Sequence, residues 1–394
     1  MEQFAIPRPT LSLDGYVFPF EGEKHLATIV ALPYREDTWR EKALPALKEF
    51  SVLVDLLRRR EWVVLLADPR LPSSLVKEFE RDHVHVLRIP YDDCWTRDFL
   101  PVFLRNPEGR LVGVDYGFNA WGGTYDGLYS PWDQDERAGA ETLLELGISR
   151  YGKQKDFILE GGSIHTDGQG TLLVTSCCLL SPGRNPGLSQ EKIEERLKQS
   201  LNVKKVIWLP KGIVNDETDG HVDNVACFLK PGVVGLAWSE DPEDPQYPDC
   251  VADLEVLEKE TDAEGRPLTV VKIPLPKPEY LTREEAAGIV LDGKAVERLE
   301  GRRLAASYIN FYQGEDYVIL PQFGDKEADL KAVSLFREIY PEKAILPMES
   351  HEILLGGGNI HCVTKQIPYT GQIQIEEAPA SRHHFYDEQK EDRP

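Results

Sequence analysis

The stretch Leu354-Leu355-Gly356-Gly357-Gly358-Asn359-Ile360-His361-Cys362-Val363-Thr364 is the part of the sequence around which the rest is organised. Three consecutive glycines allow positive φ angles and close approach to the backbone, but they lose more entropy on folding than other residues do. Apolar and β-branched residues follow them, so we expect Cys362 to lie just past a flexible loop and to enter a strand. A thiol in such a place is a candidate nucleophile. The alternative is a structural cysteine buried beside a tight turn.

The length and composition are those of a large globular protein. The chain has 394 residues, of which 41% are hydrophobic, so it can bury a large core. Size alone favours about two or three domains, but no low-complexity linker divides the chain. No run of roughly 18 apolar residues is present, and the first residues lack the basic-then-apolar order of a signal peptide. We therefore expect a cytoplasmic protein without a membrane partner.

The net charge of −22 limits the class of partner. Such a surface repels nucleic acid and attracts cations, although solubility alone explains most of these charges. The cysteines form no Cys-x-x-Cys pair and share no repeated spacing, so we expect neither a zinc ribbon nor a disulfide framework. They are Cys94, Cys177, Cys178, Cys227, Cys250 and Cys362.

Apolar runs alternate with amphipathic stretches along the chain, a pattern that predicts the α/β class. Helices are expected over residues 38–60, 135–147, 189–201 and 325–339. Strands are expected over residues 26–32, 63–67, 84–89, 101–104, 111–116, 171–175, 206–209, 225–229, 233–238, 268–273, 318–320 and 344–346. We expect residues 1–368 to form a single domain and residues 369–394 to form a polar tail with little to bury.

One unit recurs in this pattern: a strand, a polar or glycine-rich loop, a strand, a helix and a strand. It recurs around Asp98, Glu160, His221 and Cys362, with weak sequence identity between the copies. A closed ring of such units would bring the loops to one centre. The His-Val-Asp spacing would also place His221 and Asp223 on the same side of a strand, because side chains alternate along strands.

Each of these side chains has an ordinary structural explanation. Asp98 could pair with its neighbour Arg97, Glu160 could cap a glycine turn, and His221 could be a hydrogen-bonded core histidine. His221 and Asp223 could also ligate a metal, and the ligand set would then be completed by Asp93 or Asp219. The case for a common site rests on their joint occurrence at equivalent points of the repeated unit.

Nucleophilic attack on a guanidinium group is a reaction that would use all of these side chains. It is planar, cationic and never deprotonated at neutral pH, so two carboxylates, Asp98 and Asp223, could orient it and offset its charge. The Cys362 thiolate could then attack the central carbon. His221 has the pKa range to protonate the leaving ammonia, and Glu160 could keep His221 charged.

The carboxylates of this set should control the ionisation of Cys362. Carboxylates near Cys362 should disfavour its thiolate in the empty site. A cationic substrate, together with a protonated His221, would reverse that effect. We therefore expect the nucleophile to be activated mainly when a cation binds.

Seven stretches together make the sequence similar to the agmatine deiminases, within the guanidine-modifying (pentein) superfamily. They run in order across about residues 20–368 and are residues 95–98, 115–123, 159–165, 207–210, 216–224, 303–312 and 356–362. The resemblance implies a five-bladed α/β propeller (the pentein fold) with pseudo-fivefold repeats around a central active site. It implies hydrolysis of agmatine to N-carbamoylputrescine and ammonia, for putrescine biosynthesis, with no metal or organic cofactor.

The resemblance also implies a role for each residue of the set. Cys362 would form a covalent amidino-cysteine intermediate, Asp98 and Asp223 would hold the guanidinium, and His221 and Glu160 would handle protons. After ammonia leaves, His221 would activate the water that hydrolyses the intermediate.

The rest of the substrate is expected to meet three further residues. Glu217 is the candidate for the distal ammonium group, and Trp95 and Trp121 are candidates for the walls around the aliphatic stem. The sequence departs from the family pattern at Leu100, where glycine is usual, and at Lys365, where glutamine is common.

Other functions remain open on the sequence. A peptidylarginine or free-arginine deiminase of the same superfamily would need a partner for a carboxylate or a peptide backbone, whereas Glu217 and the acidic chain favour agmatine. A catalytically silent binding module is opposed by retention of the whole set. A metallohydrolase is opposed by the lack of a second well-spaced histidine near His221. We expect a small cationic guanidino substrate and no nucleic acid, and leave open whether the protein is a homo-oligomer.

Overall fold

The computed structural model describes residues 12–371, so most of the predicted tail at 369–394 lies outside the described residues. Within the described range the strands form five separate sheets, which confirms the predicted α/β class. In the order of neighbouring strands across each sheet, they are β4 (Val102–Arg105), β5 (Leu111–Gly117) and β6 (Ser149–Ile158); β7 (Ile164–Thr166), β8 (Thr171–Thr175) and β9 (Lys205–Leu209); β10 (Ala226–Lys230), β11 (Val233–Trp238) and β12 (Thr269–Pro274); β13 (Tyr312–Gln313), β14 (Tyr317–Gln322) and β15 (Ala344–Glu349); and β16 (Lys365–Pro368), β1 (His25–Ala31), β2 (Trp62–Leu66) and β3 (Val84–Leu87).

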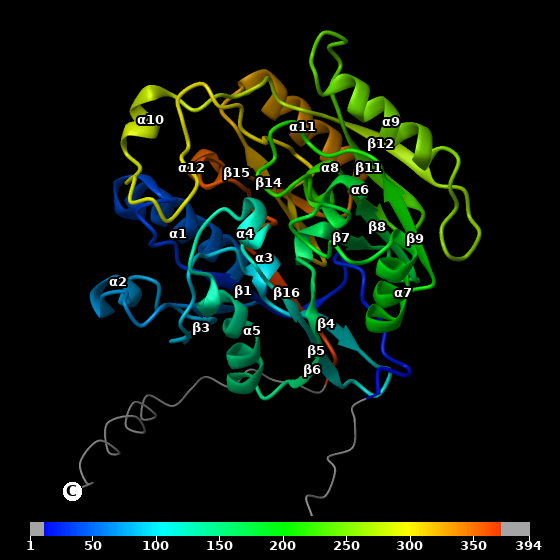
Figure 1. The fold of residues 1–394 in the computed structure, drawn as a ribbon, viewed down its shortest axis with the longest axis horizontal. Coiled ribbons are helices and arrows are strands. Elements are labelled where there is room, and N and C mark those ends of the chain that lie inside the picture. Colours follow the sequence, from blue (N-terminus) through cyan, green and yellow to red (C-terminus); the bar gives the residue numbers. More distant parts are fainter. Residues whose placement is uncertain (1–11, 372–394) are drawn as a thin grey trace, which may run out of the picture.

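Every sheet repeats one connection pattern. Its first two strands pair antiparallel, and its second and third strands pair parallel. A parallel pair needs a crossover, and a helix supplies it each time. In Figure 1 these helices lie around the outside of the molecule: α1 (Leu44–Arg58), α5 (Asp133–Glu145), α7 (Gln190–Leu201), α9 (Tyr247–Leu257) and α11 (Lys326–Ile339).

The fifth sheet joins the two ends of the described chain. Strand β16 pairs antiparallel with β1, with His25 opposite Pro368 and Ile29 opposite Lys365. Every residue of β1 is buried, because the strand lies between β16 and β2. Residues separated by most of the sequence therefore form one sheet.

The crossover helices bury one face each, as their apolar spacing predicts. In α1 the fully buried side chains include Phe50, Val54 and Leu57. Helix α7 begins after Ser189, whose side chain accepts a hydrogen bond from the backbone N–H of Lys192, as the sequence predicts for this N-cap.

Short helices fill the connections between these elements. They are η1 (Arg40–Ala43), α2 (Ser73–Lys77), α3 (Thr96–Phe99), α4 (Gly123–Asp126), η2 (Gly161–Ser163), α6 (Ser176–Leu179), α8 (Val222–Val225), α10 (Arg283–Ala287) and α12 (His351–Leu355). The helix expected over residues 38–60 begins only at Leu44, because residues 41–43 have positive φ angles. None of the described helices is long and apolar enough to cross a membrane.

The segments that lead from one sheet to the next carry the candidate site. Each of these five connections places polar side chains in the interior of the molecule. In chain order these side chains are Asp98 before β4, Glu160 before β7, His221 and Asp223 before β10, Asn310 before β13, and Cys362 before β16.

Candidate active site

Cys362 lies in a turn that follows α12, and it is 6% exposed. The prediction that it enters a strand was wrong, because β16 begins only at Lys365. Its Sγ atom is 3.1 Å from Nδ2 of Asn310, which donates to the sulfur, and 3.6 Å from Oδ2 of Asp223. The thiol therefore faces one amide donor and one carboxylate.

The three glycines before Cys362 are explained by close packing. A Cβ atom at each would lie between 2.4 and 2.6 Å from a neighbouring side chain: Trp39 at Gly356, Glu217 at Gly357 and Trp95 at Gly358. Gly357 also has a φ angle of +112°, which side-chain-bearing residues rarely adopt. At Gly358 the added atom would lie 3.0 Å from the Cys362 sulfur. The run of glycines thus leaves room beside the thiol.

Asp98 presents a buried carboxylate to the same space. Its Oδ1 atom accepts a hydrogen bond from the backbone N–H of Gly162 at 2.9 Å, and its Oδ2 atom accepts one from the Trp121 indole at 3.0 Å. Burial raises the pKa of Asp98; the charge of His221 opposes this, and the charges of Asp223 and Glu160 add to it. An added cation in this space would favour the ionised form.

His221 lies between two of the predicted acids. Its Nδ1 atom is 3.8 Å from Oδ1 of Asp98, and its Nε2 atom is 3.8 Å from Oε2 of Glu160. Although burial alone would lower it, Asp98, Cys178 and Glu160 hold the pKa of His221 well above its ordinary value. The expectation of a strand here was wrong: His221 is the N-cap of α8, and a helical turn carries Asp223.

Glu160 is kept ionised by an arginine. Its Oε1 atom lies 2.9 Å from Nε of Arg184, an ion pair between two fully buried side chains. Burial would raise the pKa of Glu160, but Arg184 and His221 lower it below its ordinary value. Arg184 belongs to none of the motifs in the sequence, and its distance from Glu160 along the chain gave no signal of the contact.

Asp223 uses its two oxygens differently. Oδ2 lies 2.8 Å from Nδ1 of His361, whereas Oδ1 is buried with no hydrogen-bond partner among the described residues. Burial would raise the pKa of Asp223, but His361 and the more distant His221 and Arg97 lower it. The site therefore contains an ionised carboxylate with a free acceptor atom.

Gly162 marks the point where these groups converge. A Cβ atom there would lie 2.6 Å from Nδ1 of His221, 2.9 Å from Oδ2 of Asp223 and 2.9 Å from Oδ1 of Asp98. Any larger residue would displace them. The structure thus brings the predicted acids and His221 together around one small space.

A pocket of about 430 Å³ reaches this space from the surface, and Asp98 and Cys362 line it. Trp95, Trp121 and Glu217, the candidates for substrate contacts, also line it. The Glu217 carboxylate, however, is already paired with two arginines: Oε2 lies 2.6 Å from Nη2 of Arg298, and Oε1 lies 3.0 Å from Nη1 of Arg302.

These arginines change what Glu217 can offer. Arg298 also lines the pocket and donates two hydrogen bonds to the Glu217 carboxylate. A ligand that reaches Glu217 therefore also encounters the positive charge of Arg298. Its predicted contact with a distal ammonium group stays a prediction.

The metal set considered from the sequence is not assembled. Asp93 accepts hydrogen bonds from the indoles of Trp39 and Trp95, and Asp219 pairs with Arg184. A different trio, Glu160, Cys178 and His221, has ligand atoms within 4.8 Å of one another. Arg184 on Glu160 and the proton held by His221 make that trio a poor cation site.

Asn310 is the site residue that the sequence analysis missed. It lies in the one sheet-to-sheet connection that carries no predicted acid, histidine or cysteine. Its amide does not titrate, so a search for ionisable groups passes over it. The available signal was its place in the repeated unit.

Comparisons with known proteins agree with this geometry. Residues 17–368 match the sequence pattern of the Porphyromonas-type peptidyl-arginine deiminase family. A Latilactobacillus sakei protein provisionally named an agmatine deiminase is 46% identical over 355 residues, which are 90% of this chain and 96% of the relative. Another relative, from Selenomonas ruminantium and provisionally named in the same way, is 44% identical over 91% of this chain and 97% of its own.

Solved structures show the same likeness. Agmatine deiminase of Enterococcus faecalis is 38% identical, and the match covers 92% of this chain and 99% of that one with a TM-score of 0.87. The predicted resemblance to agmatine deiminases is confirmed. Since the family pattern spans most of the sequence, the chain belongs to the Porphyromonas-type peptidyl-arginine deiminase family.

Proposed function

We propose that this protein is an agmatine deiminase, which hydrolyses agmatine to N-carbamoylputrescine and ammonia. The observation that carries the proposal is the convergence of Asp98, His221 and Asp223 on Gly162, beside the Cys362 thiol and at the end of an open pocket. Relatives with this activity in their names match about nine-tenths of the chain.

The guanidinium would bind between Asp98 and Asp223. Asp223 offers an ionised carboxylate with a free Oδ1 atom, and the second carboxylate, Asp98, faces the same space. Bidentate hydrogen bonds would fix the plane of the group. The rings of Trp95 and Trp121, which line the pocket, would flank the aliphatic stem.

Attack by sulfur would follow from this binding. The bound cation would offset the carboxylates, so that Cys362 releases its proton to solvent and the thiolate adds to the guanidinium carbon. As the carbon–nitrogen bond breaks, the His221 imidazolium would donate its proton to the departing nitrogen, giving ammonia and an amidino-thioether. Asn310 would stabilise the sulfur through its N–H group at 3.1 Å.

Hydrolysis would complete the cycle. The neutral His221 left by the first step would take a proton from water, and the hydroxide would add to the same carbon. As the carbon–sulfur bond breaks, the added hydroxyl group would pass its proton to the departing sulfur, which releases N-carbamoylputrescine and restores the Cys362 thiol. Glu160, held by Arg184, would keep His221 oriented and favour its protonated form between steps.

The architecture is proposed to be a five-bladed α/β propeller in a single catalytic domain over residues 1–368. The five sheets support this, because each has an antiparallel pair, a parallel pair and a crossover helix. Strand β16 would close the ring by pairing with β1. A role in putrescine biosynthesis belongs to the same proposal. So does a cytoplasmic location, which the free state of all the cysteines supports.

A second candidate is deimination of free or peptide-bound arginine. Arg298 in the pocket lining favours it, because a guanidinium there could meet a carboxylate. Ammonia release from agmatine, arginine and a peptidyl-arginine separates the two. We expect release from agmatine above the others, and no release from agmatine would contradict the proposal. A Cys362→Ala variant should release none.

A further inference from the structure

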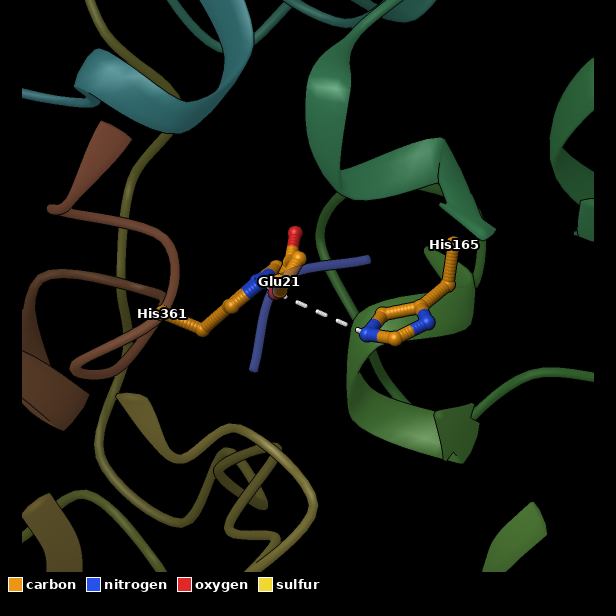
Figure 2. A group of neighbouring side chains, drawn as sticks. All are labelled: Glu21, His165 and His361. Carbon is orange, nitrogen blue, oxygen red and sulfur yellow. Dashed lines mark hydrogen bonds and ion pairs between the residues drawn. The ribbon is translucent and has the colours of Figure 1, made fainter. Parts of the chain in front are cut away.

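A second buried cluster lies beside Asp223, around a small cavity separate from the pocket that Cys362 lines. It contains Glu21, in the turn before β1, His165 in β7, and His361, the neighbour of Cys362. Figure 2 shows Glu21 between the two histidine rings. None of these residues has a part in the proposed reaction.

The contacts of His361 fix its protonation. Its Nδ1 atom is 2.8 Å from Oδ2 of Asp223, and its Nε2 atom is 2.9 Å from Oε2 of Glu21. An ionised carboxylate can only accept hydrogen bonds, so both ring nitrogens must carry a proton. His361 is therefore an imidazolium between two carboxylates, with its charge close to the guanidinium-binding acid.

The row of charges continues behind Glu21. The other oxygen of Glu21 pairs with Nη1 of Arg97 at 2.8 Å, and Nε of Arg97 donates to the backbone carbonyl of His361 at 3.2 Å. Negative and positive charges thus alternate from Asp223 through His361 and Glu21 to Arg97. Such alternation offsets the burial of each ion.

A metal is the obvious alternative occupant, since ligand atoms of Glu21, His165 and His361 lie within 4.8 Å of one another. The backbone N–H of Phe228 donates to Nδ1 of His165 at 3.2 Å. A neutral His165 must then carry its proton on Nε2, the atom that faces Glu21 at 3.5 Å. A protonated nitrogen does not ligate a cation, so the geometry favours a hydrogen-bond network.

The network distinguishes the two acids that face the substrate. Among the described residues, Asp98 accepts hydrogen bonds from the neutral donors Gly162 and Trp121 and lies 3.8 Å from His221, whereas Asp223 accepts a direct hydrogen bond at 2.8 Å from a full cation. In agreement, the pKa of Asp98 is raised by burial, while that of Asp223 is lowered by His361 in spite of burial. The bond to His361 also occupies Oδ2 and leaves Oδ1 free.

We propose that His361, with Glu21 behind it, is a positioning residue that keeps Asp223 ionised and fixes the orientation of its carboxylate, whose Oδ2 atom faces Gly162 and the Cys362 sulfur. The proposal rests on the proposed function, because it assigns a role at the same substrate site. The charged and titratable groups described around the His361 ring are Asp223, Glu21, Arg97, His165, Cys227 of β10 and the adjacent Cys362.

Agmatine binding to a Cys362→Ser variant, measured by calorimetry as a function of pH, tests the role without turnover. Adding His361→Asn keeps a side-chain donor near the Nδ1 position but removes the charge. Asp223 should then hold its proton to higher pH. We expect affinity near neutral pH to fall roughly tenfold and the acid limb of the binding curve to move up by about one pH unit.

Two further variants complete the test. Glu21→Gln keeps an acceptor for Nε2 of His361 but removes the charge, so it should shift the acid limb in the same direction by less. His165→Asn, the control, keeps an acceptor for the Phe228 N–H group and removes only the 3.5 Å contact with Glu21, so it should shift the acid limb by less than Glu21→Gln does. A His361→Asn curve that superimposes on the parent, or an equal shift in His165→Asn, would overturn the proposal.

Two outcomes must be kept separate. Failure of the unsubstituted enzyme to release ammonia from agmatine would refute the proposed function, and guanidinium chloride would then replace agmatine as the probe of Asp223. If His361→Asn fails to fold, the nearly isosteric Glu21→Gln carries the test. An unshifted Glu21→Gln curve would then refute the role of the network.

Discussion

Cys362 lies where its thiolate is unfavourable until a cation arrives. Burial raises the pKa of the Cys362 thiol well above its ordinary value, and the carboxylates of Asp223 and Asp98 raise it further. The amide of Asn310 offsets this in part by donating to the sulfur. A guanidinium held by the two acids would shift the balance to the thiolate. Ionisation of the nucleophile is thus coupled to binding.

This coupling predicts slow alkylation of Cys362 in the free enzyme. Below a raised pKa the thiol keeps its proton, so its reaction with iodoacetamide should be slow at neutral pH and rise only at alkaline pH. Asp98→Asn, which removes one negative charge, should speed it at neutral pH. Peptide mass spectrometry must follow Cys362 separately, because Cys177 is exposed. Fast labelling of Cys362 at neutral pH in the free enzyme would contradict the coupling.

Asn310 should act on the chemical step. Its Nδ2 group touches the sulfur at 3.1 Å, and its Oδ1 atom accepts from the backbone N–H of His361 at 3.0 Å. Asn310→Ala should lower kcat by about 100-fold, a typical loss for one donor at a developing charge. Asn310→Asp keeps an acceptor for His361 but places a second carboxylate at the sulfur, so its kcat should be lower still. Steady-state kinetics measures both variants. An unchanged kcat in Asn310→Ala would contradict a role for the Asn310 amide in the chemical step.

Sheet-to-sheet connections are the elements that build the site. The sequence predicted four of the five, because an acid, a histidine or a cysteine stands after an apolar run at Asp98, Glu160, His221 and Cys362. It missed the connection at Asn310, where the functional group is a neutral amide. Propensity could not show this, since asparagine is common in any loop.

Local conformation was harder to predict than position. The period-two argument placed His221 and Asp223 on a strand, but a helical turn, α8, carries Asp223. Two polar residues are too short a pattern to separate a strand from a helical turn, and His221 lies outside the helical turn, as its N-cap. Contacts made far along the chain, such as Arg184 with Glu160, leave no local pattern at all.

Helix α1 supports the site through its buried face. Phe50 is fully buried and packs edge-on against Trp39, which stacks on the pocket residue Trp95. Phe50→Ala should lower the free energy of unfolding by about 3–5 kcal/mol through the cavity it leaves, and should raise KM as Trp95 loosens. Val52→Ala on the exposed face is the matched control and should change stability by less than about 0.5 kcal/mol. Equal losses in chemical denaturation would contradict this account of α1.

The whole molecule presents a strongly negative surface to a cationic substrate. Its net charge of −22 should raise the local concentration of cations and their rate of encounter with the pocket. The field is screened within about 10 Å at moderate ionic strength. The surface charge should therefore affect the rate at which the substrate associates with the enzyme, and it should leave the rate of the chemical step unchanged.

Added sodium chloride should therefore lower kcat/KM for agmatine while leaving kcat at saturation nearly constant. Potassium chloride at matched ionic strength is the control for a specific effect of sodium. A stopped-flow or steady-state series over increasing salt measures both constants. A kcat/KM that stays level or rises with salt would show that the surface charge serves solubility alone.

The covalent role of Cys362 is the central claim, and acid quenching during turnover tests it most directly. Enzyme mixed with agmatine, quenched with acid and digested, should give an amidino adduct on the peptide that contains Cys362, with ammonia in solution. The Cys362→Ser variant should give neither. Ammonia release that continues at an unchanged rate in Cys362→Ala, with no adduct in the unsubstituted enzyme, would contradict the account.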